Sequence, residues 1–533
     1  MGYRGWRFLT IGAAVLAAQL SGAPVRAEDT AFAQALAVAA GKDPAMAAFY
    51  RARDYQPLWT DAADAGRRAA FLEALDHVTD QALPAERYDL AGLETALGSA
   101  ATERDRALVE VRMTEDFLRY ATDVQSGILD PAKIEVNMVR KIQRPDQTAL
   151  LTSLATAADP VAYMRGLMPQ EWQYAALMRE KVKLTRLIDR GGWGPQVTAK
   201  ALLPGQSGPD VVSLRNRLIA MGYLAPTASA SYDDALTGAV MRFQADHGLM
   251  VDGKAEKVTL GEVNVPALER LKAVDVALER WRWLPRDLGA RHVWVNLPDY
   301  SAEVIDDGKV TFRTPAIIGQ ASADGKKETP EFSDRIRYLD VNPTWNVPRS
   351  IMSKEYLPAM QKDPTADGQL QLVDTAGNVV DRSTVDFNQY TGDTFPYLLK
   401  QPPSDGNALG LVKFMFPNRY NIYLHDTPTK WLFKNTVRAY SHGCVRLQKP
   451  FDLAYVILAR QSTDPKQEFQ SVLDTKKETT IGLKTPVPVH LVYFTAVPSL
   501  TGHMQYRRDL YGRDAKVAVA LQQAGVAFPF KGN

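Results

Sequence analysis

From Tyr420 to Pro450 the chain reads YNIYLHDTPTKWLFKNTVRAYSHGCVRLQKP. A run of β-like character, Tyr420–Leu424, leads directly to His425. The only cysteine of the chain, Cys444, follows in a second segment. A lone thiol and a histidine on separate backbone are the minimal set for a thiolate nucleophile with its base. The stretch therefore predicts a cysteine acyl-transfer centre within a β-rich domain.

Length and composition describe an ordinary soluble protein of several domains. The chain has 533 residues, of which 46% are hydrophobic and 23% are charged. This length predicts roughly three or four domains. The 63 basic and 61 acidic residues almost cancel. Composition therefore gives no argument for nucleic acid as a partner.

The N-terminus has the pattern of a cleavable export signal. Arg4 and Arg7 precede the apolar run Phe8–Leu20, and Val25-Arg26-Ala27 offers small residues at a cleavage site. We predict a signal peptide over residues 1–27 and a mature start at Glu28. An uncleaved anchor is the alternative, but the apolar run is shorter than the ~20 residues that span a bilayer. No later segment is predicted to cross a membrane.

Export changes the meaning of the single cysteine. A lone cysteine cannot pair within the chain, and an unpaired thiol in an oxidising compartment is a liability unless it has a function. A small buried hydrophobe is the alternative. The polar neighbours His442 and Arg446 argue against an apolar niche.

The first part of the mature chain is predicted to be helical. Residues 28–204 carry apolar residues at helical spacing over 31–40, 67–78 and 104–120, without a catalytic constellation. Residues 205–265 predict a small module of three helices, the first capped by Asp210. Residues 266–289 predict a further helix and a linker.

A β-rich domain is predicted over residues 290–500. Alternating segments such as 292–297, 302–305 and 310–313 have strand periodicity, and residues 488–493 form a late strand. Residues 353–408 are polar and turn-rich, so they predict either a lid over the site or a decorated surface loop. Residues 501–533 form a C-terminal segment. The fold class is multidomain α+β.

Two histidines compete for the role of base. We favour His425, because a separate segment allows free choice of geometry, and we assign His442 a secondary hydrogen-bonding role. Gly443 has no Cβ, and its N–H together with that of Cys444 is predicted to hold an oxyanion. Zinc held by these side chains and Asp426 is the rival interpretation, but no close pair of ligands is present.

Two resemblances refine this prediction. The order Val211, Leu214, Leu218, then Thr237, Val240, Phe243, then Asp252-Gly253 resembles peptidoglycan-binding domain type 1. A helical spacer that binds nothing is the alternative. The motif Ser441–Arg446, preceded by His425, resembles the L,D-transpeptidase catalytic (YkuD) domain. The segments 329–330, 342–348, 279–285, 423–428 and 511–514 fit its YcbB-like periplasmic subgroup, which has a helical scaffold domain and a capping subdomain.

The resemblance implies a periplasmic enzyme that needs no cofactor or metal. Cys444 would attack diaminopimelate in a stem peptide, expel D-alanine and pass the acyl group to a neighbouring stem, and carbapenems would acylate it. The substrate-binding residues would be Arg446, Tyr423, Ser441, Trp345 and Asn342. For Arg446 a structural ion pair is the alternative, and for Trp345 and Asn342 it is core packing.

Stem peptides and glycan would be the partners, with cell-wall synthesis proteins as further candidates and nucleic acid excluded. Two other functions stay open. One is an L,D-carboxypeptidase or thioester hydrolase acting on stems or wall-linked protein, and the other is a non-catalytic wall-binding protein.

Overall fold

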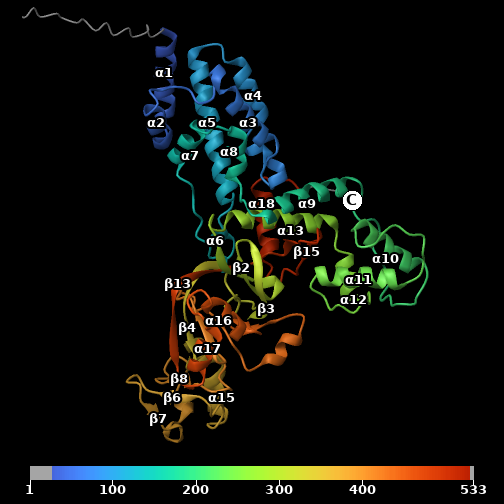
Figure 1. Cartoon of the computed structure of the whole chain (residues 1–533), viewed down its shortest axis with the longest axis vertical. Coiled ribbons are helices and arrows are strands. Elements are labelled where there is room, and N and C mark those ends of the chain that lie inside the picture. The colour runs from blue at the N-terminus through green and yellow to red at the C-terminus, as the bar shows by residue number, and fades with distance from the viewer. Residues whose placement is uncertain (1–26, 529–533) are drawn as a thin grey trace, which may run out of the picture. The chain divides into compact units, whose positions relative to one another are not determined.

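The computed structural model describes residues 27–528, and Figure 1 shows the order of its elements. Of the predicted signal peptide over residues 1–27, all but Ala27 lies outside the described residues. The described chain forms two compact units. One holds residues up to 71, 89–118 and 146–160, and the other holds residues 72–88, 119–145 and everything from 161 onward. No helix among the described residues is long and apolar enough to cross a membrane.

The predicted helical character of the first part is confirmed. Its helices are α1 (Ala27–Ala40), α2 (Pro44–Arg51), α3 (Ala65–Asp76), α4 (Leu90–Ser99), α5 (Glu103–Ser126), α6 (Pro131–Ile134), α7 (Gln147–Ala155), α8 (Pro160–Leu167) and α9 (Trp172–Asp189). The first unit packs around Trp59, whose ring lies 5.2 Å from that of Phe71 and 5.7 Å from that of Phe117. Buried Glu110 accepts hydrogen bonds from the Tyr50 hydroxyl and from backbone N–H groups of residues 58–60.

The three-helix module is present as predicted, with one correction at its start. Its helices are α10 (Pro209–Ala220), α11 (Asp234–Asp246) and α12 (Lys257–Val263). The N-cap of α10 is Gly208 and not Asp210, because Pro209 occupies the first helical position and moves Asp210 into the first turn. Val211, Leu214 and Leu218 pack in the core of the module. Helix α13 (Ala267–Arg282) follows and is buried over most of its length.

The domain that follows contains a closed mixed sheet. Its strands are β1 (Arg291–Asn296), β2 (Ser301–Asp306), β3 (Lys309–Gly319), β4 (Phe332–Val341), β9 (Val412–Met415), β10 (Leu424–His425), β11 (Ala439–Ser441), β12 (Val445–Leu447) and β13 (Thr479–Val492). The order is β11-β3-β12-β10-β9-β4-β13-β1-β2, and β2 also pairs with β3. This second pairing closes the sheet on itself around a core of aliphatic and aromatic side chains.

The strand predicted over residues 420–424 is wrong in its first part. The Asn418 side chain accepts the N–H groups of Tyr420 and Ile422, and Asn421 has a φ of 54°. This side-chain-stabilised turn occupies the backbone that a longer strand would need. Strand β10 is therefore only Leu424–His425.

The excursion between β4 and β9 has a sheet and a core of its own. It contains β5 (Trp345–Asn346), α14 (Arg349–Ile351), the π-helical turn η5 (Met352–Tyr356), α15 (Leu357–Lys362), β6 (Gln371–Val373), β7 (Val379–Val380) and β8 (Leu398–Gln401). Its strands pair in the order β5-β8-β6-β7, and a hydrophobic core extends from Trp345 to Leu409. The segment is thus a folded subdomain and not a loose surface loop.

The last part of the chain returns to the closed sheet. Helices α16 (Pro450–Leu458) and α17 (Pro465–Leu473) lie between β12 and β13 in the sequence. The hairpin β14 (Ala496–Pro498) and β15 (Met504–Tyr506) then leads to α18 (Arg513–Gln523). Several side chains of this C-terminal segment reach the region around Cys444, as described below.

Candidate active site

Three adjacent strands bring the candidate catalytic residues onto one face of the sheet. In the register of β10 with its two neighbours, His425 lies beside Arg446 and beside Lys413. Leu424, Val445 and Phe414 point the other way into the core, where they are fully buried. Side chains alternate along a strand, so His425, Arg446 and Lys413 share the opposite face.

Cys444 and Tyr423 lie on the same face, because they come two residues before Arg446 and His425, respectively. The Val445 N–H donates to the Tyr423 carbonyl at 3.1 Å, which continues the pairing toward Cys444. The Cys444 thiol is partly exposed and donates to the Asn421 carbonyl, with Sγ and O 3.5 Å apart. Burial raises the pKa of the thiol to about 11, while hydrogen bonds from Tyr423 and the charges of Arg446 and Lys413 act in the opposite direction. The isolated thiol is therefore neutral at physiological pH.

His425 is held as a neutral imidazole. Only 3% of its surface is exposed, and its Nδ1 has no hydrogen-bond partner. Its ring meets the Tyr423 ring edge-on, with centroids 5.6 Å apart. Burial first, and then the charge of Arg446, lowers its pKa to about 3, against the effect of backbone contacts with Asp426 and Leu409. A neutral imidazole with an unpaired nitrogen is ready to accept a proton.

Asp426 follows His425 in the chain but is bonded elsewhere. Its Oδ2 accepts the Leu411 N–H at 2.9 Å, and its Oδ1 accepts from Lys430 Nζ at 2.6 Å. The close approach needs Gly410, because a Cβ there would lie 2.3 Å from Asp426 Oδ2. The Asp426 carboxylate therefore stabilises the turn before β9 and does not orient the His425 imidazole.

The loop that carries Cys444 is fixed by Ser441. Its Oγ donates to the Cys444 carbonyl at 2.5 Å and accepts the Gly443 N–H at 3.1 Å. Gly443 has a φ of 117°, which side-chain-bearing residues rarely adopt. The Gly443 N–H predicted to bind an oxyanion is thus already used. Among the described residues the N–H of Cys444 has no acceptor, so it is the remaining candidate.

Thr329 holds the same loop from the far side. Its Oγ1 donates to the Gly443 carbonyl at 2.7 Å and accepts the Gly319 N–H at 2.9 Å. Gly319 is required for this contact, because a Cβ there would lie 2.1 Å from the Lys327 carbonyl oxygen. The Cys444 loop, strand β3 and the segment before β4 therefore meet at a single hydroxyl.

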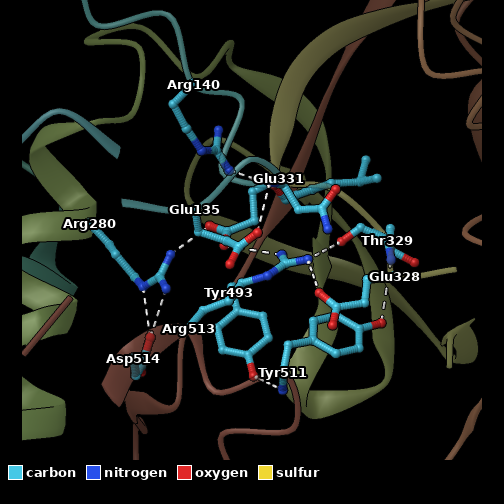
Figure 2. A network of polar contacts seen from close by, with 12 residues as sticks. Glu135, Arg140, Arg280, Glu328, Thr329, Glu331, Tyr493, Tyr511, Arg513 and Asp514 are labelled. Atoms are coloured by element: carbon cyan, nitrogen blue, oxygen red, sulfur yellow. Dashed lines mark hydrogen bonds and ion pairs between the residues drawn. The ribbon is translucent and has the colours of Figure 1, made fainter. Parts of the chain in front are cut away.

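A buried polar network supports Thr329 from the C-terminal segment. Figure 2 shows Arg513 reaching both the Thr329 carbonyl, at 2.9 Å, and Glu328, at 3.0 Å. The Tyr511 hydroxyl accepts the Thr329 N–H at 3.4 Å (Figure 2). It also donates to the Gly319 carbonyl. Arg280 of α13 joins the network through Glu331 and Asp514. The Cys444 loop is thus connected to α13 and α18.

The other predicted site residues lie in different environments. His442 turns to Glu355 of η5, with Nε2 and Oε1 2.7 Å apart, so it contacts the capping subdomain. Trp345 packs in the core of that subdomain. Asn342 donates to the carbonyls of Val472, Leu473 and Lys477, so core packing describes it better than the predicted pocket wall. Arg446 has a buried Nε without a partner, and the ion pair considered for it is not formed among the described residues.

The sequence did not predict that Lys413 and Glu355 lie at the site, nor that Thr329 forms hydrogen bonds there. Lys413 had one detectable signal, since it alternates with the apolar Val412 and Phe414 along a strand. Thr329 and Glu355 had none, because their partners lie 114 and 87 residues away in the chain. In the described part of the chain, no three His, Cys, Asp or Glu side chains gather as metal ligands would.

Comparison with known families divides the chain into three matched regions. Residues 290–489 match the L,D-transpeptidase catalytic domain (YkuD), residues 44–180 match a scaffold domain, and residues 207–262 match a "Putative peptidoglycan binding domain". A "Putative L,D-transpeptidase" of Haemophilus influenzae is 34% identical over 230 residues, which is 43% of this chain and 45% of that protein. The chain thus spans about half of the curated relative it matches.

Solved structures of bacterial proteins are also similar. An L,D-transpeptidase of Xylanimonas cellulosilytica is 17% identical over 56% of this chain and 98% of that chain, with a TM-score of 0.18. An L,D-transpeptidase of Stackebrandtia nassauensis is 15% identical over 56% of this chain and 97% of that chain, with a TM-score of 0.22. These TM-scores are low, so the assignment of the domains rests on the family matches and the curated relative.

Proposed function

We propose that this chain, which carries an L,D-transpeptidase catalytic domain and a peptidoglycan-binding domain, is an exported peptidoglycan L,D-transpeptidase that works through a thioester on Cys444. One observation carries the proposal. The register of β10 with β12 puts the His425 imidazole and the Cys444 thiol on one sheet face, and the Tyr423 ring contacts that of His425. A nucleophile and a base in this arrangement are suited to acyl transfer.

The first half of the reaction forms the thioester. Sγ of Cys444 attacks the carbonyl carbon at the L-centre of diaminopimelate in a donor tetrapeptide. The thiol proton passes to His425, and His425 delivers it to the amine of the leaving D-alanine as the C–N bond breaks. The backbone N–H of Cys444 holds the oxyanion of the tetrahedral intermediate.

The second half transfers the acyl group. The side-chain amine of a diaminopimelate on an acceptor stem attacks the thioester carbon and gives a proton to His425. A C–N bond forms, the C–S bond breaks, and the thiolate takes the proton back. The product is a direct crosslink between two diaminopimelate residues, and the periplasm is the compartment that holds this substrate.

The charges around the thiol favour this sequence. Arg446 and Lys413 favour the thiolate, and the same charges disfavour an imidazolium before the substrate arrives. Arg446 has one unpaired buried nitrogen, so it is also placed to pair with a substrate carboxylate. The unbound enzyme thus rests as a neutral thiol and imidazole, and the ion pair forms as the carbonyl is attacked.

The product pattern tests the proposal. Protein beginning at Glu28 is incubated with tetrapeptide muropeptides, and the products are separated and weighed by mass spectrometry. We expect crosslinked dimers and free D-alanine, and neither with Cys444→Ala. If tripeptide monomer is the sole product, the activity is that of a carboxypeptidase or thioester hydrolase and not that of a transferase. If the unaltered protein forms no product, the remaining function is that of a non-catalytic wall-binding protein.

Inhibitor chemistry tests the nucleophile separately. A carbapenem has a strained acyl group, so we expect it to add its full mass to the protein at Cys444. The adduct should be absent from Cys444→Ala. An adduct of the same size on that variant would show that another residue is the nucleophile.

A further inference from the structure

An exposed charged cluster joins the capping subdomain to the loop that carries Cys444. Glu355 of η5 accepts hydrogen bonds from His442 Nε2 at 2.7 Å and from Lys327 Nζ at 3.1 Å. Lys327 comes from a third segment, the stretch between β3 and β4. The exposed fractions of the side chains are 41% for Glu355, 31% for His442 and 33% for Lys327, so a ligand can reach them from solvent. Ion pairs this exposed add little to stability, which favours a role in binding.

Two members of the cluster are attached to the Cys444 loop. His442 is separated from Cys444 by Gly443 alone. Lys327 lies two residues before Thr329, whose hydroxyl donates to the Gly443 carbonyl at 2.7 Å. The cluster is therefore fixed beside the thiol by contacts that already position the loop.

The turn η5 faces both flanks of Cys444 along the chain. Glu355 contacts His442, two residues before Cys444, and the next residue, Tyr356, lies within electrostatic range of Arg446, two residues after it. Burial raises the pKa of Tyr356, and the charge of Arg446 acts against this rise. Turns of π-helix are frequent at functional sites. Because Arg446 is placed for one substrate carboxylate, the Glu355 side remains for a second group.

Both partners of the ion pair have unused bonding capacity. Lys327 uses one of its three N–H donors, to Oε1 of Glu355. His442 bonds to the same oxygen, and none of the described residues bonds to Oε2. Partial burial alone would raise the pKa of Glu355, but the hydrogen bonds and charges of His442 and Lys327 outweigh it and lower the pKa. The cluster thus offers a free oxygen of an ionised carboxylate next to a cation.

The acceptor of the proposed reaction carries the complementary groups. Its attacking amine stands on a carbon that also bears a carboxylate, because the side chain of diaminopimelate ends in an amino-acid group. A carboxylate oxygen accepts an N–H of such an amine, and a lysine ammonium donates to the carboxylate beside it. An amine on a plain alkyl chain, such as the lysine side chain, satisfies only the first of these contacts.

We propose that Glu355 and Lys327 determine the specificity for the acceptor. Glu355 Oε2 accepts an N–H of the attacking amine, and Lys327 Nζ binds the carboxylate on the same carbon. The inference rests on the proposed function and adds the recognition of its second substrate. The amine still gives its proton to His425 during attack, so neither residue takes part in the bond changes. A nucleophile held at two points loses less entropy on reaching the thioester.

A competition between two acceptors tests the proposal. Protein beginning at Glu28 is given a tetrapeptide donor and equal concentrations of two tripeptide acceptors, one with diaminopimelate and one with lysine at the third position. The crosslinks formed with each acceptor are counted by mass spectrometry. Both arise from the same thioester, so their ratio does not change with stability or with the rate of thioester formation.

We expect the unaltered chain to favour the diaminopimelate acceptor by about tenfold, and Lys327→Met to remove this preference. Lys326→Met is the matched control, because Lys326 is the adjacent lysine and pairs with Asp324 instead. It should keep the preference. Glu355→Gln keeps an acceptor for His442 but removes the charge. Both crosslinks should then fall about three- to tenfold relative to donor hydrolysis, measured as D-alanine released without a crosslink.

Several outcomes would overturn the inference. These are equal use of both acceptors by the unaltered chain, a preference retained in Lys327→Met, or the same loss in Lys326→Met. An unchanged ratio of crosslinking to hydrolysis in Glu355→Gln would reduce the cluster to a contact between the capping subdomain and the loop. In each of these cases crosslinks still form, so the proposed function stands. If the unaltered chain forms no crosslink, the proposed function fails and this inference fails with it.

Discussion

The hydroxyl of Thr329 is predicted to position the nucleophile, and Thr329→Val removes it with little change of shape. Two hydrogen bonds disappear, one to the Gly443 carbonyl and one from the Gly319 N–H. Thr329 itself is fully buried, so water does not replace the lost hydroxyl. Each buried group left unpaired costs about 1–3 kcal/mol, so the two together are expected to lower the free energy of unfolding by about 2–6 kcal/mol.

The same change should affect catalysis more than folding alone explains. With its carbonyl released, Gly443 can rotate, and Cys444 moves with it. A displacement near 1 Å is enough to cost about 100-fold in rate. We therefore expect kcat to fall by about 10- to 100-fold while KM for the donor peptide changes little.

The assay combines urea denaturation with initial rates of crosslinking, measured where the variant is fully folded. Thr329→Ser is the matched control, since it keeps the hydroxyl and should retain most of the rate. The alkylation rate of Cys444 by iodoacetamide gives a readout that global stability does not change. Normal kcat and normal alkylation in folded Thr329→Val would refute the positioning role, and so would a Thr329→Ser variant as slow as Thr329→Val.

Three further predictions follow from the site and its supporting network. Because burial raises the pKa of Cys444 to about 11, alkylation by iodoacetamide should rise about tenfold per pH unit from pH 7 toward pH 10, and a plateau already at pH 6 would instead reveal a preformed ion pair. His425→Ala should abolish carbapenem acylation, whereas His442→Ala, which loses only a contact to Glu355, should retain much of it; the opposite ranking would exchange their roles. Arg280→Met leaves Glu331 and Asp514 without this buried partner, so it should cost about 3–5 kcal/mol in urea denaturation, and a loss below 1 kcal/mol would contradict the network.

From the sequence alone, Cys444 and His425 are the candidate nucleophile and base, because both are local signals. A single cysteine in a chain with an export pattern needs no neighbours to attract attention, and His425 stands out beside it. Helical periodicity likewise predicted a three-helix module over residues 205–265, which contains α10 and α11, and a helix within residues 266–289, where α13 lies. The start of β10 was mispredicted, because the Asn418 turn bonds its own backbone and competes with the strand.

What only the tertiary structure decided is which groups act on the predicted residues. The Gly443 N–H is occupied by Ser441, and the Gly443 carbonyl by Thr329 from a segment that reaches it only when the sheet closes. The protonation states of Cys444 and His425 depend on burial, which no local pattern specifies. The amino-acid sequence therefore identified the candidate residues. Their hydrogen bonds, protonation states and pKa values depend on contacts between residues that are far apart in the chain.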